Sequence, residues 1–171
     1  MSVGPTRVLF VCLGNICRSP MAKWVFADMV RARGLAGAFH IDSCGLGGWH
    51  EGEDADPRSR AVAERLRLAC EHRARQIRVP QDFEAFDLLV AMDRENLRGL
   101  ARIDAPRERV RLLRSFDPAM AGLPEVHLDV PDPYYGGDEG FDRMHQMIVA
   151  ACAGMLERLA PPTGPTRATA G

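Results

Sequence analysis

Short segments rich in apolar residues recur along this chain, separated by longer stretches in which apolar residues return every three or four positions. Four of these short segments predict β-strands: residues 8–11, 39–42, 86–91 and 109–113. The run at 8–11 lacks the alternation of a half-exposed strand, which is typical of strands buried on both faces of a parallel sheet.

The stretches between and after these strands repeat their apolar residues every three or four positions, as amphipathic helices do. Helices are predicted from Pro20, from Asp56-Pro57 with Val62, Leu66 and Ala69 facing the core, over residues 93–103, and from Phe141 to Leu159. Strands alternating with helices predict an α/β fold, a single domain whose central four-stranded parallel sheet has helices on both faces. The domain is expected to span residues 1–160, and the Pro-, Gly-, Ala- and Thr-rich tail 161–171 is predicted to be disordered.

The loop that follows the first strand combines features of an anion-binding site. Cys12 ends the strand, and open α/β sheets bind ligands at the carboxyl ends of their strands. Gly14 and Asn15 are residue types that readily adopt positive φ, so this loop can turn its N–H groups inward. Ser19-Pro20 predicts a helix start, with Ser19 as the N-cap, and a helix N-terminus attracts anions.

Cys12 and Arg18 add reactive chemistry to this loop. N–H donors, a helix N-terminus and a guanidinium all favour the thiolate form of a cysteine. Arg18 suits bidentate binding of phosphoryl oxygens. Nucleophilic attack of Cys12 on phosphorus, through a covalent phosphocysteine, is therefore predicted. The alternative is a buried structural cysteine and an arginine in a surface ion pair.

Two segments carry a resemblance to a known family. The residues Cys12-Leu13-Gly14-Asn15-Ile16-Cys17-Arg18-Ser19-Pro20 resemble the phosphate-binding loop of the low-molecular-weight protein tyrosine phosphatases. Far downstream, Asp132-Pro133-Tyr134-Tyr135-Gly136 resembles the general-acid loop of the same family. The resemblance runs from about residue 7 to about 159, places the phosphate-binding loop after the first strand, and implies a phosphotyrosine phosphatase that needs no cofactor.

The same resemblance assigns roles to further residues. It implies that Asp132 acts as general acid and then as general base, whereas an Asp-Pro pair taken alone would indicate a turn. A supporting network of Asn15, Ser19, Ser43 and His72 would hold the loop. The Ser19 hydroxyl would then bond the Cys12 sulfur, a role that competes with capping the helix. Without the resemblance, His72 would be read as a histidine at the end of a helix.

An apolar crevice above the loop is predicted to select the substrate. Its depth would suit phosphotyrosine and leave a phosphoserine phosphate short of the loop, and Ile16 favours phosphotyrosine over phosphoarginine because related arginine phosphatases carry Thr there. His50 and His127 are predicted to be surface residues. The predicted substrate-binding residues are Leu13, Gly14, Asn15, Ile16, Cys17, Ser19, Trp49, Tyr134 and Tyr135.

The five cysteines are spread along the chain, which argues against a secreted disulfide framework. In the family, the cysteine at the position of Cys17 can form a protective disulfide with the nucleophile; the alternative is a small buried side chain. Cys44, Cys70 and Cys152 are predicted core residues, the last two on helices. No second pair completes a zinc-like spacing, so no metal site is predicted. Cys44 and Leu46 depart from the family pattern, in which Ala and Thr are usual.

Composition narrows the class of protein further. The chain has 171 residues, 46% of them hydrophobic, and a formal net charge of −1, which gives no footprint for nucleic acid or membrane binding. The N-terminus lacks the pattern of a signal peptide, so a cytoplasmic location is expected, although export without a signal peptide stays open. The expected partner is a phosphotyrosine-containing protein, with a tyrosine kinase as one candidate, and the protein is expected to be a monomer or weak homodimer.

Two other functions remain alternatives. The first is arsenate reduction on the same fold, which needs a downstream cysteine pair, but no cysteine lies between Cys70 and Cys152. The second is a non-catalytic phosphopeptide-binding or redox-sensing protein. Such a binding protein would be expected to lack Cys12, Arg18 or Asp132, and all three are present.

Overall fold

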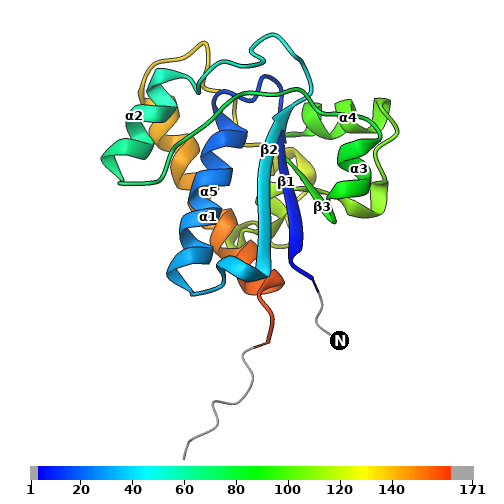
Figure 1. Cartoon of the computed structure of the whole chain (residues 1–171). Coiled ribbons are helices and arrows are strands. Elements are labelled where there is room, and N and C mark those ends of the chain that lie inside the picture. The colour runs from blue at the N-terminus through cyan, green and yellow to red at the C-terminus, as the bar shows by residue number, and fades with distance from the viewer. Residues whose placement is uncertain (1–3, 163–171) are drawn as a thin grey trace, which may run out of the picture.

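The computed structural model describes residues 4–162 and has the predicted parallel sheet at its centre (Figure 1). The four strands are β1 (Thr6–Cys12), β2 (Phe39–Gly45), β3 (Leu88–Ala91) and β4 (Val110–Leu112), in the order β2-β1-β3-β4. All neighbouring strands are parallel, and β1 pairs along its whole length with β2 and over Val8 to Val11 with β3. The strand that carries Cys12 is therefore held on both sides.

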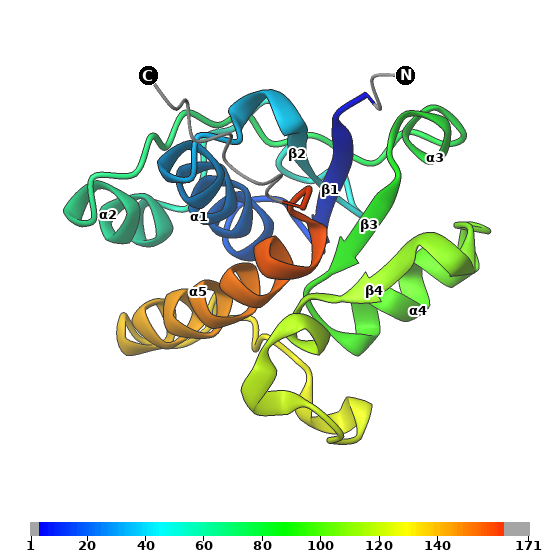
Figure 2. The same ribbon diagram turned by 90° about the horizontal axis from the view of Figure 1, so that it is seen from below.

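Helices cover both faces of this sheet, as predicted (Figure 2). One face is covered by α1 (Arg18–Ala32) and α5 (Glu139–Leu159), with α2 (Pro57–Arg65) beside them, and the other by α3 (Gln81–Ala85) and α4 (Arg94–Arg102). The helix α3 was not predicted because five residues are too short to display a helical repeat. Short 3-10 turns lie at Ala36–Ala38, Arg107–Arg109, Leu113–Phe116, Pro118–Met120 and Glu125–His127.

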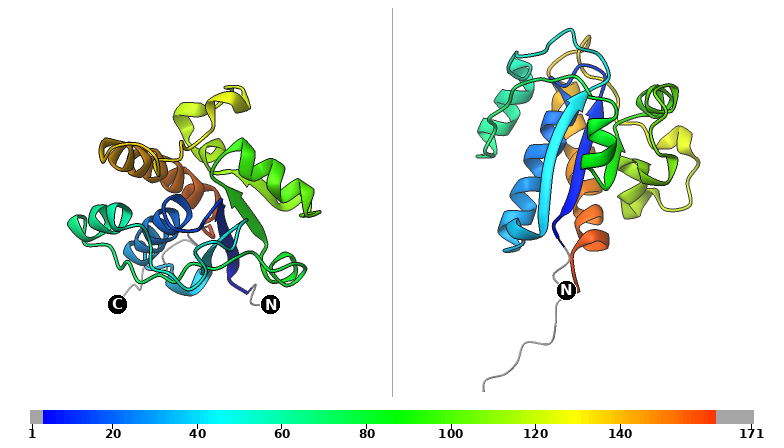
Figure 3. Two further views of the ribbon diagram at one scale, coloured as in Figure 1. Left: turned by 90° about the horizontal axis from the view of Figure 1, so that it is seen from above. Right: turned by 45° about the vertical axis from the view of Figure 1, so that its right-hand side comes forward.

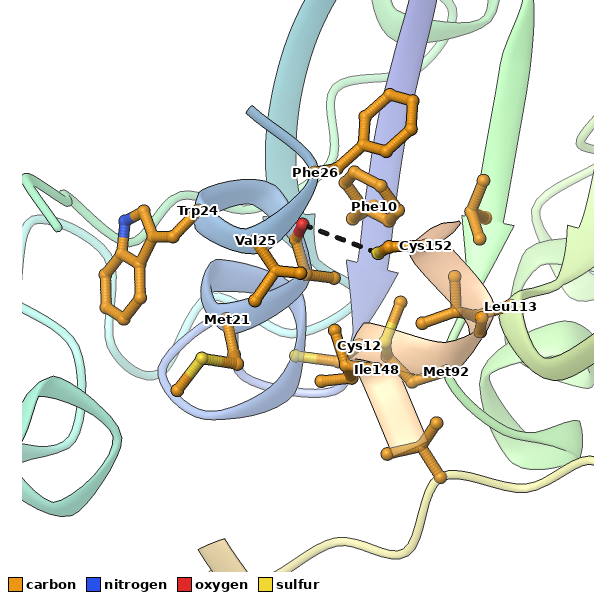
Figure 4. Packing of buried hydrophobic residues seen from close by; sticks show 14 of the residues in the cluster. Phe10, Cys12, Met21, Trp24, Val25, Phe26, Met92, Leu113, Ile148 and Cys152 are labelled. Atoms are coloured by element: carbon orange, nitrogen blue, oxygen red, sulfur yellow. Dashed lines mark hydrogen bonds between the residues drawn. The ribbon is translucent and has the colours of Figure 1, made fainter. Parts of the chain in front are cut away.

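The side chains of β1 divide the core between the two faces. Val8, Phe10 and Cys12 face α1 and α5, whereas Leu9 and Val11 face α4. All of these are buried, which explains why the strand is apolar without alternation. Figure 4 shows part of the core on the side of α1 and α5, in which Phe10 packs edge-on against Phe26 of α1 with ring centroids 5.9 Å apart.

Two predicted boundaries near the site were wrong. Helix α1 begins at Arg18, with Cys17 at its N-cap and no side-chain cap, so Ser19 and Pro20 lie inside the first turn. Proline is tolerated there because first-turn N–H groups have no partner within the helix. Strand β2 continues to Gly45, which places Ser43 and Cys44 in the sheet rather than in a loop, because the pairing with β1 extends as far as Cys12.

The predicted core face of α2 was also partly wrong. The helix ends at Arg65, and Leu66 and Ala69 are exposed; the face toward the core consists of Ser59, Val62 and Ala63. The chain turns at Arg67, which has a φ of +58° and cannot continue a right-handed helix. Cys70, predicted on a helix, therefore lies half-buried in an irregular segment.

Three loops meet at the carboxyl ends of the central strands (Figure 3). They are the loop after β1, the segment between β2 and α2, and the segment that leads into α5. Within residues 4–162, no helix is long and apolar enough to cross a membrane. The tail predicted to be disordered lies outside the described residues apart from Pro161 and Pro162.

Helix α5 approaches the turn at Leu113–Phe116 so closely that Gly154 has no room for a side chain. A Cβ at this position would lie 1.9 Å from the Phe116 carbonyl oxygen. We expect Gly154→Ala to lower the free energy of unfolding by about 1–3 kcal/mol, the usual cost of overpacking, although alanine favours a helix by about 1 kcal/mol. Urea unfolding measures this change.

The matched control is Gly37→Ala, because a Cβ at Gly37 would have no neighbour within 4 Å and no positive φ opposes it. This control should change the free energy of unfolding by less than about 1 kcal/mol. A Gly154→Ala protein as stable as the wild type would contradict the close packing of α5 on the turn.

Candidate active site

The loop of residues 12–18, the phosphate loop, curls around the sulfur of Cys12. Asn15 has a φ of +57°, and its backbone N–H donates to Cys12 Sγ at 3.3 Å. Gly14 does not adopt positive φ, contrary to the prediction. Its lack of a side chain instead leaves room for His50, whose ring would lie 3.1 Å from a Cβ on Gly14.

The Ser19 hydroxyl faces the Cys12 sulfur rather than capping the helix. The two atoms lie 3.0 Å apart, and both residues are buried. Asn15 Nδ2 donates to Ser19 Oγ at 2.8 Å, so the single hydroxyl proton is free for another acceptor. The Cys44 carbonyl, at 3.4 Å, is the more distant of the two acceptors, which favours a hydrogen bond from Ser19 to the sulfur.

The four residues of the predicted supporting network lie together around Asn15. Its side-chain Nδ2 donates to Ser43 Oγ at 3.0 Å as well as to Ser19, and His72 Nε2 lies 2.7 Å from the Asn15 carbonyl oxygen. Sequence reasoning missed Arg75, whose backbone N–H donates to Asn15 Oδ1 at 3.0 Å. No side chain signals such a contact, because any residue except proline could make it.

His72 is not at a helix end, as its sequence context would suggest, but in an irregular segment beneath the loop. Burial lowers the pKa of His72, although the hydrogen bond to Asn15 opposes this effect. Its Nδ1 is buried and has no hydrogen-bond partner among residues 4–162, so the neutral ring with its proton on Nε2 fits the site. The ring packs edge-on against Trp24, with centroids 6.0 Å apart.

Arg18, the last residue of the phosphate loop, is only 2% exposed and is held by three acceptors. Its Nη1 donates to Asp93 Oδ2 at 2.5 Å and to the Val130 carbonyl at 3.0 Å, and its Nη2 donates to Asp132 Oδ2 at 3.3 Å. Burial alone would lower the pKa of Arg18, but Cys12, Asp93 and Asp132 outweigh it and raise the pKa. The guanidinium is therefore a fixed positive charge.

Asp93 was missed as a site residue. It follows β3 at the carboxyl end of the sheet, and this position is a signal that the sequence did offer. The same carboxylate caps α4 by accepting from Asn96 N at 2.7 Å. Asp93 therefore orients Arg18 from a helix that is itself fixed by the sheet.

Asp132 reaches the pocket from the segment of residues 131–138, the acid loop. Its Oδ1 accepts from Tyr134 N at 3.1 Å, and its side chain is 40% exposed. Asp129 and Asp138, which lie near Asp132 in the sequence, do not line this pocket. Asp129 pairs with Arg94, whose hydrogen bonds outweigh the effect of burial and lower the pKa of Asp129. Asp138 lines a separate hollow beside α2 and α5.

A pocket of about 330 Å³ opens above the phosphate loop. It is lined by Cys12, Leu13, Gly14, Ile16, Cys17, Arg18, Trp49, His50, Asp132, Tyr134 and Tyr135. These include every predicted substrate-binding residue except Asn15 and Ser19, whose side chains are fully buried behind the loop. His50 was predicted to be a surface residue; it lies at the pocket, paired with Glu53 at 2.8 Å, while His127 is exposed as predicted.

The cysteines differ in their surroundings. Cys17 lines the pocket beside Cys12, and burial, followed by the charge of Asp56, raises the pKa of its thiol. Cys44 and Cys152 are fully buried, and all five cysteines are free. In the part of the chain that the structure describes, no group of three or more His, Cys, Asp or Glu side chains is arranged to hold a metal ion.

The lowered pKa of His72 predicts how stability depends on pH. The unfolded chain binds the proton more readily, at a pKa of about 6.5. The contribution of His72 to the free energy of unfolding is therefore fully present above pH 6.5 and is lost as the pH falls below this value toward the lowered pKa of the folded protein. His72→Asn should show a smaller loss between pH 7 and pH 5 in urea unfolding. His145, whose pKa burial also lowers, contributes with the same sign in both proteins. Equal pH slopes for the two proteins would contradict a neutral, buried His72.

Comparison with known proteins identifies the family. A family model described as low molecular weight phosphotyrosine protein phosphatase matches residues 7–162. A low molecular weight protein-tyrosine-phosphatase of Streptomyces coelicolor is 53% identical over 154 residues, covering 88% of this chain and 91% of that protein.

Two solved structures extend the comparison. A protein tyrosine phosphatase from Entamoeba histolytica matches with a TM-score of 0.81 and 34% identity, covering 90% of this chain and 96% of that one. A structure named drosophila arginine phosphatase matches with a TM-score of 0.80 and 31% identity, covering 91% and 99%. With the family model spanning nearly all of the described fold, this chain belongs to the low molecular weight phosphotyrosine protein phosphatase family.

Proposed function

We propose that this protein hydrolyses phosphotyrosine in protein substrates, with Cys12 as the nucleophile. The observation that carries the proposal is one pocket lined by Cys12, Arg18 and Asp132, with the Cys12 sulfur inside the phosphate loop. A nucleophile, a cation for the phosphoryl oxygens and a proton donor are the three groups that metal-independent phosphate-ester hydrolysis requires.

In the first step, the Cys12 thiolate attacks phosphorus. The S–P bond forms as the bond from phosphorus to the tyrosine oxygen breaks, and Asp132 gives its proton to the departing phenolate. Arg18 and the N–H groups of the phosphate loop stabilise the three remaining phosphoryl oxygens. The products are a phosphocysteine and a free tyrosine side chain.

In the second step, water hydrolyses the phosphocysteine. Asp132, now a carboxylate, takes a proton from the water molecule. The water oxygen attacks phosphorus, and the S–P bond breaks to release inorganic phosphate. The departing thiolate needs stabilisation, and the Ser19 hydroxyl at 3.0 Å supports this role.

The pocket walls support phosphotyrosine as the substrate class. Trp49 and Tyr134 offer aromatic surfaces to a phenyl ring, and Ile16 gives the pocket an apolar lining. Because an arginine phosphatase shares this fold, the preference rests on these side chains rather than on the fold. A tyrosine kinase among the substrates, a cytoplasmic location, a monomer or weak homodimer, and a Cys12–Cys17 disulfide stay predictions.

The alternative functions have less support. Cys12 and Cys17 line the pocket, while Cys44 and Cys152 are buried in the core and Cys70 lies in the segment after α2, so the cysteine relay of an arsenate reductase is not evident in residues 4–162. A phosphopeptide-binding protein would have no need of the proton donor Asp132 beside the thiol.

Hydrolysis of matched peptides tests the proposed function. We expect the wild-type protein to release phosphate from phosphotyrosine peptides, much less from phosphoserine or phosphoarginine peptides, and at the same rate with EDTA present. Cys12→Ser should have no measurable activity. Tight binding of phosphotyrosine without turnover would indicate a binding protein instead, and a preference for phosphoarginine would contradict the role given to Ile16.

Asp132→Asn tests the proton donor. Asparagine keeps the acceptor for Tyr134 N but cannot transfer a proton, so kcat/KM for phosphotyrosine should fall by about 10²–10⁴-fold. A variant that keeps the wild-type kcat/KM for phosphotyrosine would contradict the assignment.

A further inference from the structure

We propose that Arg58 is a positioning residue that connects the phosphate loop to the acid loop and thereby places Asp132 for proton transfer. This inference rests on the proposed function of Asp132. Arg58 does not line the pocket above Cys12, so its effect would pass through the acid loop.

The first link joins α2 to the phosphate loop. The backbone N–H of Asp56, the N-cap of α2, donates to the Ile16 carbonyl at 2.8 Å, and the Ser59 hydroxyl donates to the Cys17 carbonyl at 3.2 Å. Both Asp56 and Ser59 are buried. The first turn of α2 is thus fastened to two consecutive carbonyls of the loop that holds the nucleophile.

The second link joins Asp56 to Arg58. The guanidinium forms a fork on the carboxylate, with Nε 3.0 Å from Oδ1 and Nη2 2.9 Å from Oδ2. The same carboxylate accepts from Arg58 N at 2.8 Å as the helix cap. The hydrogen bonds from Arg58 lower the pKa of Asp56 against the effect of burial, so the carboxylate stays charged and holds the fork.

The third link joins Arg58 to the acid loop. Its Nη2 donates to the Tyr134 carbonyl at 3.0 Å and its Nη1 to the Gly136 carbonyl at 3.3 Å. The guanidinium also stacks on Phe141, with 4.4 Å from Cζ to the ring centroid, and lies 5.8 Å from the Tyr134 centroid. A planar, forked cation can make all these contacts at once, and a lysine cannot.

The hydrogen bonds of Arg58 connect the second half of the acid loop to a distant part of the chain. Residues before Asp132 are anchored, since Val130 N donates to the Met92 carbonyl at 2.8 Å and its carbonyl accepts from Arg18. Among the described residues, the hydrogen bonds that reach residues 133–138 from a distant part of the chain are the two from Arg58. Asp132 also bonds Tyr134 N, so a shift of Tyr134 would move the carboxyl group.

Substrates with different leaving groups reveal this role. Phosphotyrosine needs a proton on its leaving oxygen, whereas 2,4-dinitrophenyl phosphate releases a stable anion that needs none. Arg58→Met keeps an unbranched, largely apolar stem but removes the charged fork. We expect kcat/KM for phosphotyrosine to fall at least about 10-fold, within the range of general acid catalysis, and kcat/KM for dinitrophenyl phosphate to change less than about 3-fold. Arg58→Lys should give a smaller loss of the same kind.

The matched control is Arg60→Met. Arg60 lies on the same helix and pairs with Asp54 and Glu64 rather than with either loop, so both substrates should react as with the wild type. Equal losses for the two substrates in Arg58→Met would overturn the proposal, because they would indicate damage to the whole site. No loss for either substrate would also overturn it. If Arg58→Met does not fold, Arg58→Lys carries the same comparison.

A double-mutant cycle separates this proposal from the proposed function. In an Asp132→Asn background, Arg58→Met should cause no further loss with phosphotyrosine, because the group it positions is already inactive. If Asp132→Asn alone affects both substrates equally, the proposed general acid is wrong. If Asp132→Asn shows the leaving-group dependence and Arg58→Met does not, only the positioning role of Arg58 is wrong.

Discussion

The buried guanidinium of Arg18 constrains the arrangement of the whole site. A buried charge without partners costs several kcal/mol, so the fold must bring acceptors to it from other elements. Asp93 comes from the end of β3, and Val130 and Asp132 come from the segment that leads into α5. Three chain segments that are distant in sequence therefore meet at one cation, and Cys12 and Asp132 line the same pocket as a result.

Asn15 provides the second constraint, and it acts through its backbone and its side chain together. The left-handed backbone turns an N–H toward the sulfur, while the side-chain amide bonds two hydroxyls and accepts from Arg75. Asparagine is one of the few residues that tolerate positive φ and also carry a donor and an acceptor. A glycine here would allow the turn but would leave Ser19 and Ser43 without their common donor.

The sequence was informative where one residue type serves one purpose. The apolar run before Cys12 predicted the buried strand, and the spacing of Cys12, Gly14, Asn15 and Arg18 predicted an anion site. Ser19 was ambiguous because serine both caps helices and bonds sulfur, and only the observed start of α1 at Arg18 excludes the cap. Arg58, Arg75 and His50 were missed because their contacts depend on which loops come together in space, and no local pattern encodes that meeting.

The side chains in the walls of the pocket are much more exposed to solvent than those at its floor. Cys12 and Arg18, at its floor, are buried, whereas Trp49 in a wall is 70% exposed and Tyr135 is 95% exposed. Replacing an exposed side chain on a loop costs a protein little stability, while replacing a buried, hydrogen-bonded one costs much more. Mutations can therefore accumulate in the walls while the chemistry of the floor is preserved. In an evolving lineage, this division lets the choice of substrate drift without a new catalytic mechanism having to arise.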